Sequence, residues 1–206
     1  MSTDTVLFEL GTEELPAGEY VGMAEALCTG ICDGLQSYSL SRGEAKVLAT
    51  PRRLTVIVYD VATKAADTEQ EILGPPIAAA KTKEGEWSPA AIGFAKKQDV
   101  AVEALDTIAT DKGDRLGLIK RVTGAVCAEV LPDIISHAVA QIPVSKRMRW
   151  GRERHEFLRP VQWLMLLMGN ESLDISLFGL KSGRVTRGHR FHGKSEITKP
   201  IAIGIG

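Results

Sequence analysis

The chain has 206 residues, of which 44% are hydrophobic and 25% are charged, with a formal net charge of −1. This composition is typical of a soluble globular protein, and it excludes a largely disordered chain and a collagen-like repeat. The longest apolar run, residues 163–168, is far shorter than the roughly 20 residues that a membrane-spanning helix needs. The N-terminus lacks the basic and apolar stretches of a secretory signal, so we expect a cytoplasmic protein whose three cysteines are free thiols.

The first third of the chain alternates short apolar runs with one long amphipathic segment. Residues 6–10 predict a strand that is closed by an acidic turn at 11–16. Over residues 17–38, apolar side chains recur every three or four positions, which predicts an amphipathic helix. Residues 46–50 and 54–60 predict two more strands on either side of a Pro-Arg-Arg turn. A helix lying on one face of a sheet is therefore the predicted opening of the fold.

A break at residues 67–88 separates this opening from the rest of the chain. A Gly-Pro-Pro triplet, an alanine run and a charged Lys-Thr-Lys-Glu-Gly stretch make the break a predicted loop or linker. Ser88 followed by proline is typical of a helix N-terminus. The further predicted elements are a strand at 116–122, a helix at 125–141, and a hairpin of strands 157–168 and 173–178 around Gly169-Asn170.

These elements predict an α+β fold with mixed or antiparallel sheets packed by helices in two small modules. The first α+β module is expected to cover residues 1–66. The second, with a basic face, is expected to cover residues 89–206, and residues 67–88 form the loop or linker between them.

Two pairs of charged residues flank predicted turns. Glu13 and Glu14 precede the first predicted helix, where carboxylates interact favourably with the helix dipole. They are therefore either a capping cluster, or a general base or metal ligand. Arg52 and Arg53 occupy the Pro-Arg-Arg turn, and strand alternation places them on opposite faces of the sheet. We expect one arginine to pair with a carboxylate of the Glu13–Glu14 turn.

Positive charge is concentrated in one segment. Residues 144–194 contain 11 Lys and Arg against four acids, a net charge of +7, so the other residues carry −8. Arginine guanidinium groups form bidentate hydrogen bonds with phosphates, and exposed aromatic side chains stack on bases. This segment is therefore a candidate surface for binding a polyanion. The alternative is that Trp150, Trp163 and Phe191 are core residues, with the arginines packed around a sheet. The candidate polyanion-binding residues are Lys146, Arg147, Arg149, Arg152, Arg184, Arg187 and Arg190.

A common binding surface would require these cations to converge, and a hairpin over residues 157–178 is expected to bring the two clusters together on one face. No constellation for bond-making chemistry is visible beside them. The sequence holds neither a nucleophile elbow nor a glycine loop for phosphates or dinucleotides. No pattern of cysteines or carboxylates completes a zinc site with the histidines at 137, 155, 189 and 192. We therefore expect no metal site and no catalytic residue.

Seven short motifs follow one another along the chain. They are FELGTEELP at 8–16, TPRRL at 50–54, LGPP at 73–76, AIGFA at 91–95, KRMRWG at 146–151, FLRP at 157–160 and RGHRF at 187–191. In this order they resemble the N-terminal region of the bacterial glycyl-tRNA synthetase beta subunit, and the similarity covers residues 5 to about 198.

The resemblance implies part of a glycine–tRNA ligase in which an alpha subunit carries the catalytic fold and uses ATP with magnesium. The beta subunit of that family supplies most of the tRNA recognition, so tRNA(Gly) and the alpha subunit are the expected partners. The seven basic residues above then become candidate tRNA-binding residues. Family beta chains are much longer, so this chain resembles only their N-terminal part, and we expect it to bind no cofactor and to be inactive alone. Two alternatives are an assembly module that docks the alpha subunit without touching RNA, and a truncated remnant without function.

Overall fold

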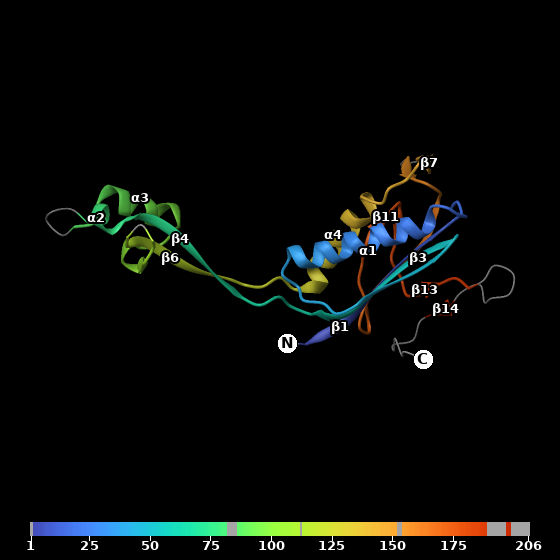
Figure 1. Cartoon of the computed structure of the whole chain (residues 1–206), viewed down its shortest axis with the longest axis horizontal. Coiled ribbons are helices and arrows are strands. Elements are labelled where there is room, and N and C mark those ends of the chain that lie inside the picture. The colour runs from blue at the N-terminus through green and yellow to red at the C-terminus, as the bar shows by residue number, and fades with distance from the viewer. Residues whose placement is uncertain (1, 82–85, 112, 152–153, 189–196, 199–206) are drawn as a thin grey trace. The chain divides into compact units, whose positions relative to one another are not determined.

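The computed structural model describes residues 2–81, 86–111, 113–151, 154–188 and 197–198 (Figure 1). The chain divides into two compact units. Unit 1 comprises residues 1–66 and 124–206, and unit 2 comprises residues 67–123. Both units combine antiparallel sheets with helices, which confirms the predicted α+β class.

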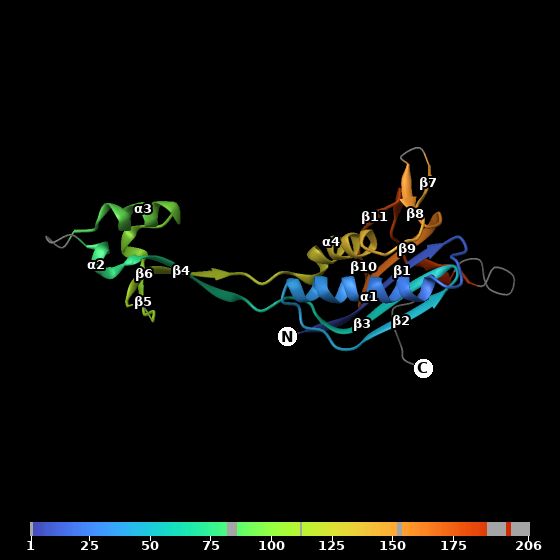
Figure 2. The ribbon, with the colours of Figure 1, turned by 45° about the horizontal axis from the view of Figure 1, so that its top comes forward.

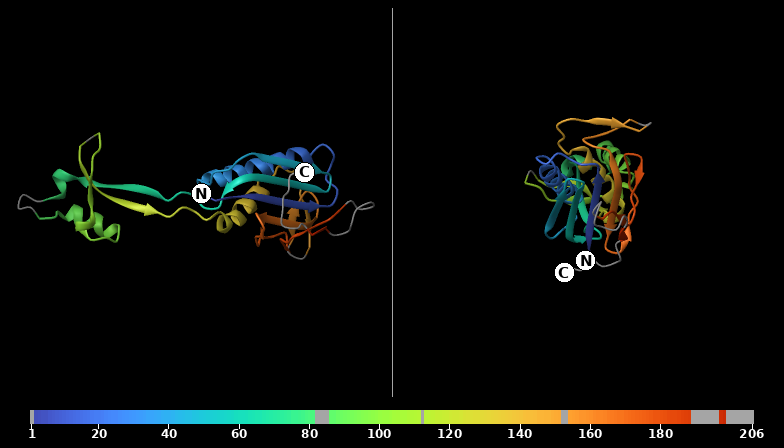
Figure 3. Two further views of the ribbon diagram at one scale, coloured as in Figure 1. Left: turned by 90° about the horizontal axis from the view of Figure 1, so that it is seen from below. Right: turned by 90° about the vertical axis from the view of Figure 1, so that its right-hand side faces the viewer.

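Unit 1 is built on a five-stranded antiparallel sheet in the order β10-β9-β1-β3-β2. Its strands are β1 (Thr3–Thr12), β2 (Ala45–Thr50), β3 (Arg53–Ala62), β9 (Val161–Met168) and β10 (Glu171–Ser172). Figure 3 shows β1 in blue between β3 and β9. Because both faces of this central strand are covered, every residue of β1 from Val6 onward is buried.

Two helices cover one face of this sheet (Figure 2): α1 (Tyr20–Ser37) and α4 (Cys127–Ala140). Both were predicted from apolar periodicity. They approach closely at glycines of α1, since a Cβ added at Gly30 would lie 3.0 Å from the Ala138 Cβ. One added at Gly34 would lie 2.4 Å from the Ile134 Cγ2. The glycines that weaken α1 as an isolated helix therefore permit the packing that stabilises it.

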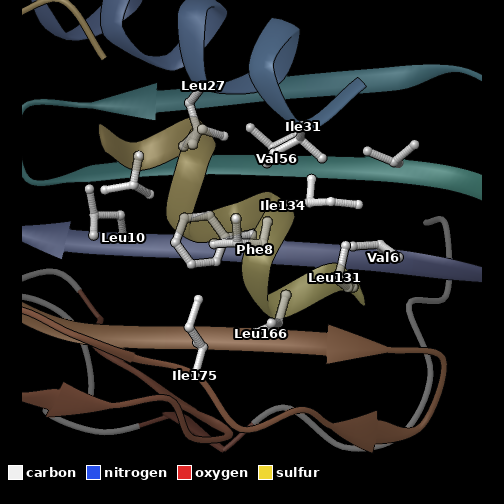
Figure 4. Close-up of a cluster of buried hydrophobic side chains, with 14 of the residues drawn as sticks. Val6, Phe8, Leu10, Leu27, Ile31, Val56, Leu131, Ile134, Leu166 and Ile175 are labelled. Carbon is white, nitrogen blue, oxygen red and sulfur yellow. The ribbon is translucent and has the colours of Figure 1, made fainter. Parts of the chain in front are cut away.

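The main core of unit 1 fills the space between the sheet and these helices (Figure 4). Phe8 and Leu10 of β1 point into it and meet Leu27 of α1, Leu131 of α4 and Leu166 of β9. All five side chains are fully buried, and each contributes about 1.5–3 kcal/mol to folding. The intervening residues of these strands face the other side of the sheet, as strand alternation requires. There a second cluster forms from Leu7, Ile57, Met165 and Leu167.

The predicted hairpin at Gly169-Asn170 is present, with Gly169 at φ +53°, but its returning strand β10 is only two residues long. The predicted strand 173–178 is wrong, because the chain leaves the sheet at this point. The Ile175 N–H donates to the Ser182 Oγ at 2.9 Å, and the Ser182 N–H donates back to the Ile175 carbonyl at 2.9 Å. This pairing turns the chain into the small hairpin β11 (Ser176–Leu177) and β12 (Leu180–Lys181).

The predicted strand 157–168 is divided at Pro160, which has no N–H to give to a strand ladder. The first residue of the predicted strand, Phe157, belongs to a separate hairpin. A further pair of strands follows β12 along the chain. The elements are β7 (Met148–Trp150) with β8 (His155–Phe157), and β13 (Val185–Thr186) with β14 (Ile197–Thr198).

Unit 2 is a three-stranded antiparallel sheet in the order β4-β6-β5 with short helices. Its elements are β4 (Thr68–Pro76), α2 (Ile77–Ala80), α3 (Pro89–Lys97), a 3-10 turn at Val102–Ala104, β5 (Asp106–Ile108) and β6 (Arg115–Val122). The predicted helix start is confirmed, because the Ser88 side chain accepts a hydrogen bond from the Ala91 N–H at 3.3 Å. A small core of its own contains Ala80, Ala91 and Leu116.

The structure divides the chain differently from the predicted modules. Residues 67–88 are not simply a linker, because β4 occupies 68–76. Pro75 and Pro76 fit there because β4 is an edge strand, where a missing N–H need not break a ladder. Residues 124–206 belong to unit 1 rather than to a second module, since α4 packs against α1 and β9 pairs with β1 in the same sheet.

Candidate functional site

Three turns that the sequence motifs singled out meet at one end of the sheet in unit 1. The acidic turn after β1 is held by its backbone, since the Glu13 N–H donates to the Pro160 carbonyl at 3.0 Å. The Leu15 N–H donates to the Pro51 carbonyl at 2.6 Å. The motifs at residues 8–16, 50–54 and 157–160 are therefore neighbours in space.

The expected ion pair between the acidic turn and the arginine turn is present. Arg52 Nη2 lies 3.5 Å from Glu13 Oε2, with side chains 29% and 45% exposed. At this exposure such a pair contributes about 0–1 kcal/mol. Arg159 forms a further hydrogen bond to this turn, donating from Nε to the Glu14 backbone carbonyl at 3.1 Å. The capping interpretation of the two glutamates is wrong, because α1 begins only at Tyr20 and its first turn holds no acid.

Glu9 is a buried carboxylate on the sheet face opposite the helices. Its Oε1 accepts hydrogen bonds from Trp163 Nε1 at 2.7 Å and from the Thr186 hydroxyl. Its Oε2 accepts from the Thr55 hydroxyl at 3.3 Å and lies 3.5 Å from Arg53 Nε. Burial of a carboxylate is costly unless it is paired and hydrogen-bonded, and these four partners supply both conditions.

Trp163 joins two arginines on this face. The Cζ of Arg53 lies 5.7 Å and that of Arg187 lies 5.5 Å from its ring centroid, both within cation–π range. Arg53 Nη2 also donates to the Arg187 carbonyl. The ring packs directly over Gly11, where an added Cβ would lie 2.0 Å from Trp163 Cε2. We call Glu9, Arg53, Trp163 and Arg187 the arginine–tryptophan cluster.

The β7–β8 hairpin carries the other group of predicted cations. Lys146 and Arg147 are exposed just before β7, and Arg149 forms an ion pair with Glu156 across the hairpin. Trp150 is turned inward and packs on Phe178, with ring centroids 5.8 Å apart. Trp150 is therefore a packing residue, whereas the cations around it face solvent.

The structure places the two groups of cations on opposite faces of the sheet rather than on one. Figure 1 shows β7 on the helix side of the sheet and β13 on the other side. Trp150 and Phe157 pack against the core on the helix side, whereas Arg187, which follows β13, lies against Trp163. The hairpin at Gly169 does not unite them, because its returning strand β10 is only two residues long and the chain then leaves the sheet. Arg184 lies near that turn and donates to the Asn170 carbonyl. Arg152 and Arg190 lie outside the described residues.

Within the described ranges, the remaining reactive side chains show no arrangement for bond-making chemistry. Burial and the neighbouring Cys32 thiol raise the pKa of Cys28 to about 11, and burial raises the pKa of Cys127 to about 11. Both thiols are neutral at pH 7, which disfavours nucleophilic or metal-binding roles. Among the described residues, no three His, Cys, Asp or Glu side chains are placed to hold a metal ion. His189 and His192 lie outside that part of the chain. Across the described ranges, no helix has the length and apolar character to cross a membrane.

Sequence reasoning missed Glu9 and left Trp163 as either a core or a stacking residue. The available signal was a single acid inside an apolar strand, because a carboxylate in such a place needs partners. Those partners come from residues 44 to 177 positions away, so periodicity along the chain could not identify them.

Comparison with known proteins gives a consistent result. A family model described as glycyl-tRNA synthetase beta subunit matches residues 6–202. Similar proteins named glycine–tRNA ligase beta subunit occur in Stutzerimonas stutzeri (39% identical over 202 residues), Pseudomonas fluorescens (42% over 192) and Xanthomonas campestris (41% over 194). These alignments cover 97%, 93% and 93% of this chain but only 29%, 28% and 28% of the relatives. The chain thus spans less than a third of the length of the curated relatives it matches.

Proposed function

The chain belongs to the glycyl-tRNA synthetase beta subunit family, and from that premise we propose that it is the N-terminal part of such a beta subunit and binds tRNA(Gly). In this proposal it works in the cytoplasm with an alpha subunit that carries the active site and uses ATP with magnesium. The contribution of this part is recognition rather than bond making. The candidate tRNA-binding residues remain Lys146, Arg147, Arg149, Arg152, Arg184, Arg187 and Arg190.

The observation that carries the proposal is the exposed positive charge at the β7–β8 hairpin. Lys146 and Arg147 are exposed on successive positions, and no carboxylate among the described residues pairs with either side chain. Arg149 uses the nearby Glu156 and is still 67% exposed. Cations that have no internal partner interact strongly with a phosphate backbone, and they release its counterions on binding.

The proposal is tested by the double variant Lys146→Ala/Arg147→Ala in the full beta subunit, assembled with its alpha subunit. Removing one cation that binds a phosphate lowers the magnitude of the salt slope of tRNA binding by about 0.7 to 0.9. We therefore expect the slope, measured from affinities at several salt concentrations, to fall by about 1.4 to 1.8 when both cations are removed.

The matched control is Lys96→Ala/Lys97→Ala, which removes two exposed cations of α3 outside the basic segment and is expected to leave the slope unchanged. An unchanged slope in the hairpin variant together with weakened binding of the alpha subunit would contradict RNA binding. That outcome would support the alternative function, a docking module for the alpha subunit.

We also expect the chain alone not to activate glycine. Neither its sequence nor the described part of its structure contains a phosphate-binding loop or a catalytic constellation. The measurement is glycine-dependent exchange of pyrophosphate into ATP by the purified chain without an alpha subunit. Exchange above background would show that catalytic residues had been overlooked, whereas exchange that returns only with the alpha subunit is the expected result.

A further inference from the structure

The arginine–tryptophan cluster brings two cations to a single carboxylate. Arg53 and Arg187 both lie within 6 Å of the Trp163 ring centroid, and Glu9 is the one acid in the cluster. Glu9 is only 4% exposed, and both of its oxygens already have two partners. The negative charge of Glu9 is therefore paired with Arg53, the arginine that forms an ion pair with it.

Arg187 is a surface cation without a carboxylate partner in the part of the chain that the structure describes. Contact with the indole ring restricts the guanidinium, and its N–H groups donate no hydrogen bond to any described residue. A guanidinium held in this way is well suited to bidentate binding of a phosphate.

The surrounding sequence favours a polyanion over a single carboxylate. Residues 175–195 contain five Lys and Arg and no Asp or Glu. An unbroken stretch of one sign produces an extended positive potential, which attracts successive phosphates more strongly than an isolated acidic side chain.

We propose that Arg187, held against Trp163, is a second RNA-binding site of this chain, which takes a backbone phosphate on the sheet face opposite the β7–β8 hairpin. Arg53 and Glu9 are its positioning residues: Arg53 donates to the Arg187 carbonyl, and Glu9 orients Trp163 and anchors Thr186, next to Arg187. The inference rests on the proposed function, because it assumes that tRNA is the ligand, but it adds a contact that the hairpin cannot make. A tRNA bound by both sites would have to reach two faces of unit 1.

The test compares Arg187→Ala, Arg187→Lys and Glu9→Gln in the full beta subunit with its alpha subunit, with tRNA(Gly) as the probe. Arg187→Ala is expected to lower the magnitude of the salt slope by about 0.7 to 0.9, whereas Arg187→Lys keeps the charge and the slope but binds more weakly. Glu9→Gln retains a side-chain oxygen for Trp163 and is expected to weaken tRNA binding through a displaced Arg187. Lys96→Ala is the control, since it removes an exposed cation outside the basic segment and is expected to leave the slope unchanged.

The outcomes separate this inference from the proposed function. Slope reductions that add when Arg187→Ala is combined with Lys146→Ala/Arg147→Ala support two distinct contacts. A slope that falls only in the hairpin variant overturns the second site and leaves the proposed function intact. A lower melting temperature of Arg187→Ala with an unchanged slope overturns it in favour of simple packing. Weaker binding of the alpha subunit with an unchanged slope overturns it in favour of an acidic protein partner. A slope that falls only in the Arg187 variant supports the second site and contradicts the hairpin.

Discussion

Phe8→Ala is expected to lower the free energy of unfolding of unit 1 by about 3–5 kcal/mol. Phe8 lies on the central strand β1 and is fully buried, and side chains from both helices and the neighbouring strands surround it (Figure 4). Removing its ring loses the free energy of transfer from water and leaves a cavity that a sheet with strands on both sides of β1 cannot close. The measurement is urea-induced unfolding of the chain, followed by circular dichroism.

The matched control is Val21→Ala on α1, where the side chain is 49% exposed and the expected change is within about 0.5 kcal/mol. Hydrogen exchange measured by mass spectrometry adds a second readout. Peptides of β1 and β9 are expected to lose protection in Phe8→Ala, whereas those of β4 and β6 keep it, because unit 2 has a core of its own. A destabilisation below about 1 kcal/mol would contradict the central position of Phe8.

Gly11→Ala is expected to destabilise unit 1 by about 3 kcal/mol, at the upper end of the range for overpacked sites. An added Cβ would lie 2.0 Å from Cε2 and 2.1 Å from Cδ2 of Trp163. Those atoms belong to the rigid ring fusion, so the whole indole must leave its place. It then gives up its hydrogen bond to Glu9 and its packing against both arginines. Thermal unfolding and the fluorescence of Trp163 measure the two effects.

Gly22→Ala is the matched control, because an added Cβ on this residue of α1 would have no neighbour within 4 Å. Alanine is the better helix former, and we expect this variant to be up to about 1 kcal/mol more stable than the parent chain. Unchanged Trp163 fluorescence in Gly11→Ala would show that the indole does not pack on this glycine. The lack of space for a Cβ beside the Trp163 ring also explains why the FELGTEELP motif has a glycine at position 11.

The sequence predicted most of the local structure, because local structure depends on neighbouring residues. The periodicity of residues 17–38 predicted α1, Ser88 and Pro89 predicted the start of α3, and Gly169-Asn170 predicted a hairpin turn. Where local prediction failed, a competing hydrogen-bond partner or the position of the strand in its sheet decided the structure. Strand 173–178 was lost to pairing with Ser182, and the prolines of β4 were accepted because that strand lies at an edge.

The candidate site likewise combines contacts that the sequence predicted with contacts that only the tertiary structure shows. The ion pair of Arg52 with Glu13 followed from two turns that flank predicted strands, so sequence reasoning could place it. Glu9 meets Trp163 and Thr186 across 154 and 177 residues, and no pattern within a strand specifies such partners. The surplus of cations in residues 144–194 was visible in the composition, but its separation onto two faces was not.

The sequence alone determined the α+β class, the main helices and strands, the polarised charge and the motifs that mark the family. Each of these depends on the periodicity or composition of short segments, which the chain carries whatever its tertiary arrangement. Only the tertiary structure decided that β1 is the central strand, that residues 124–206 return to the first unit, and that Glu9 and Arg187 share one indole. Many strand orders and registers satisfy the same apolar pattern, and a change of register by one residue reverses which side chains share a face.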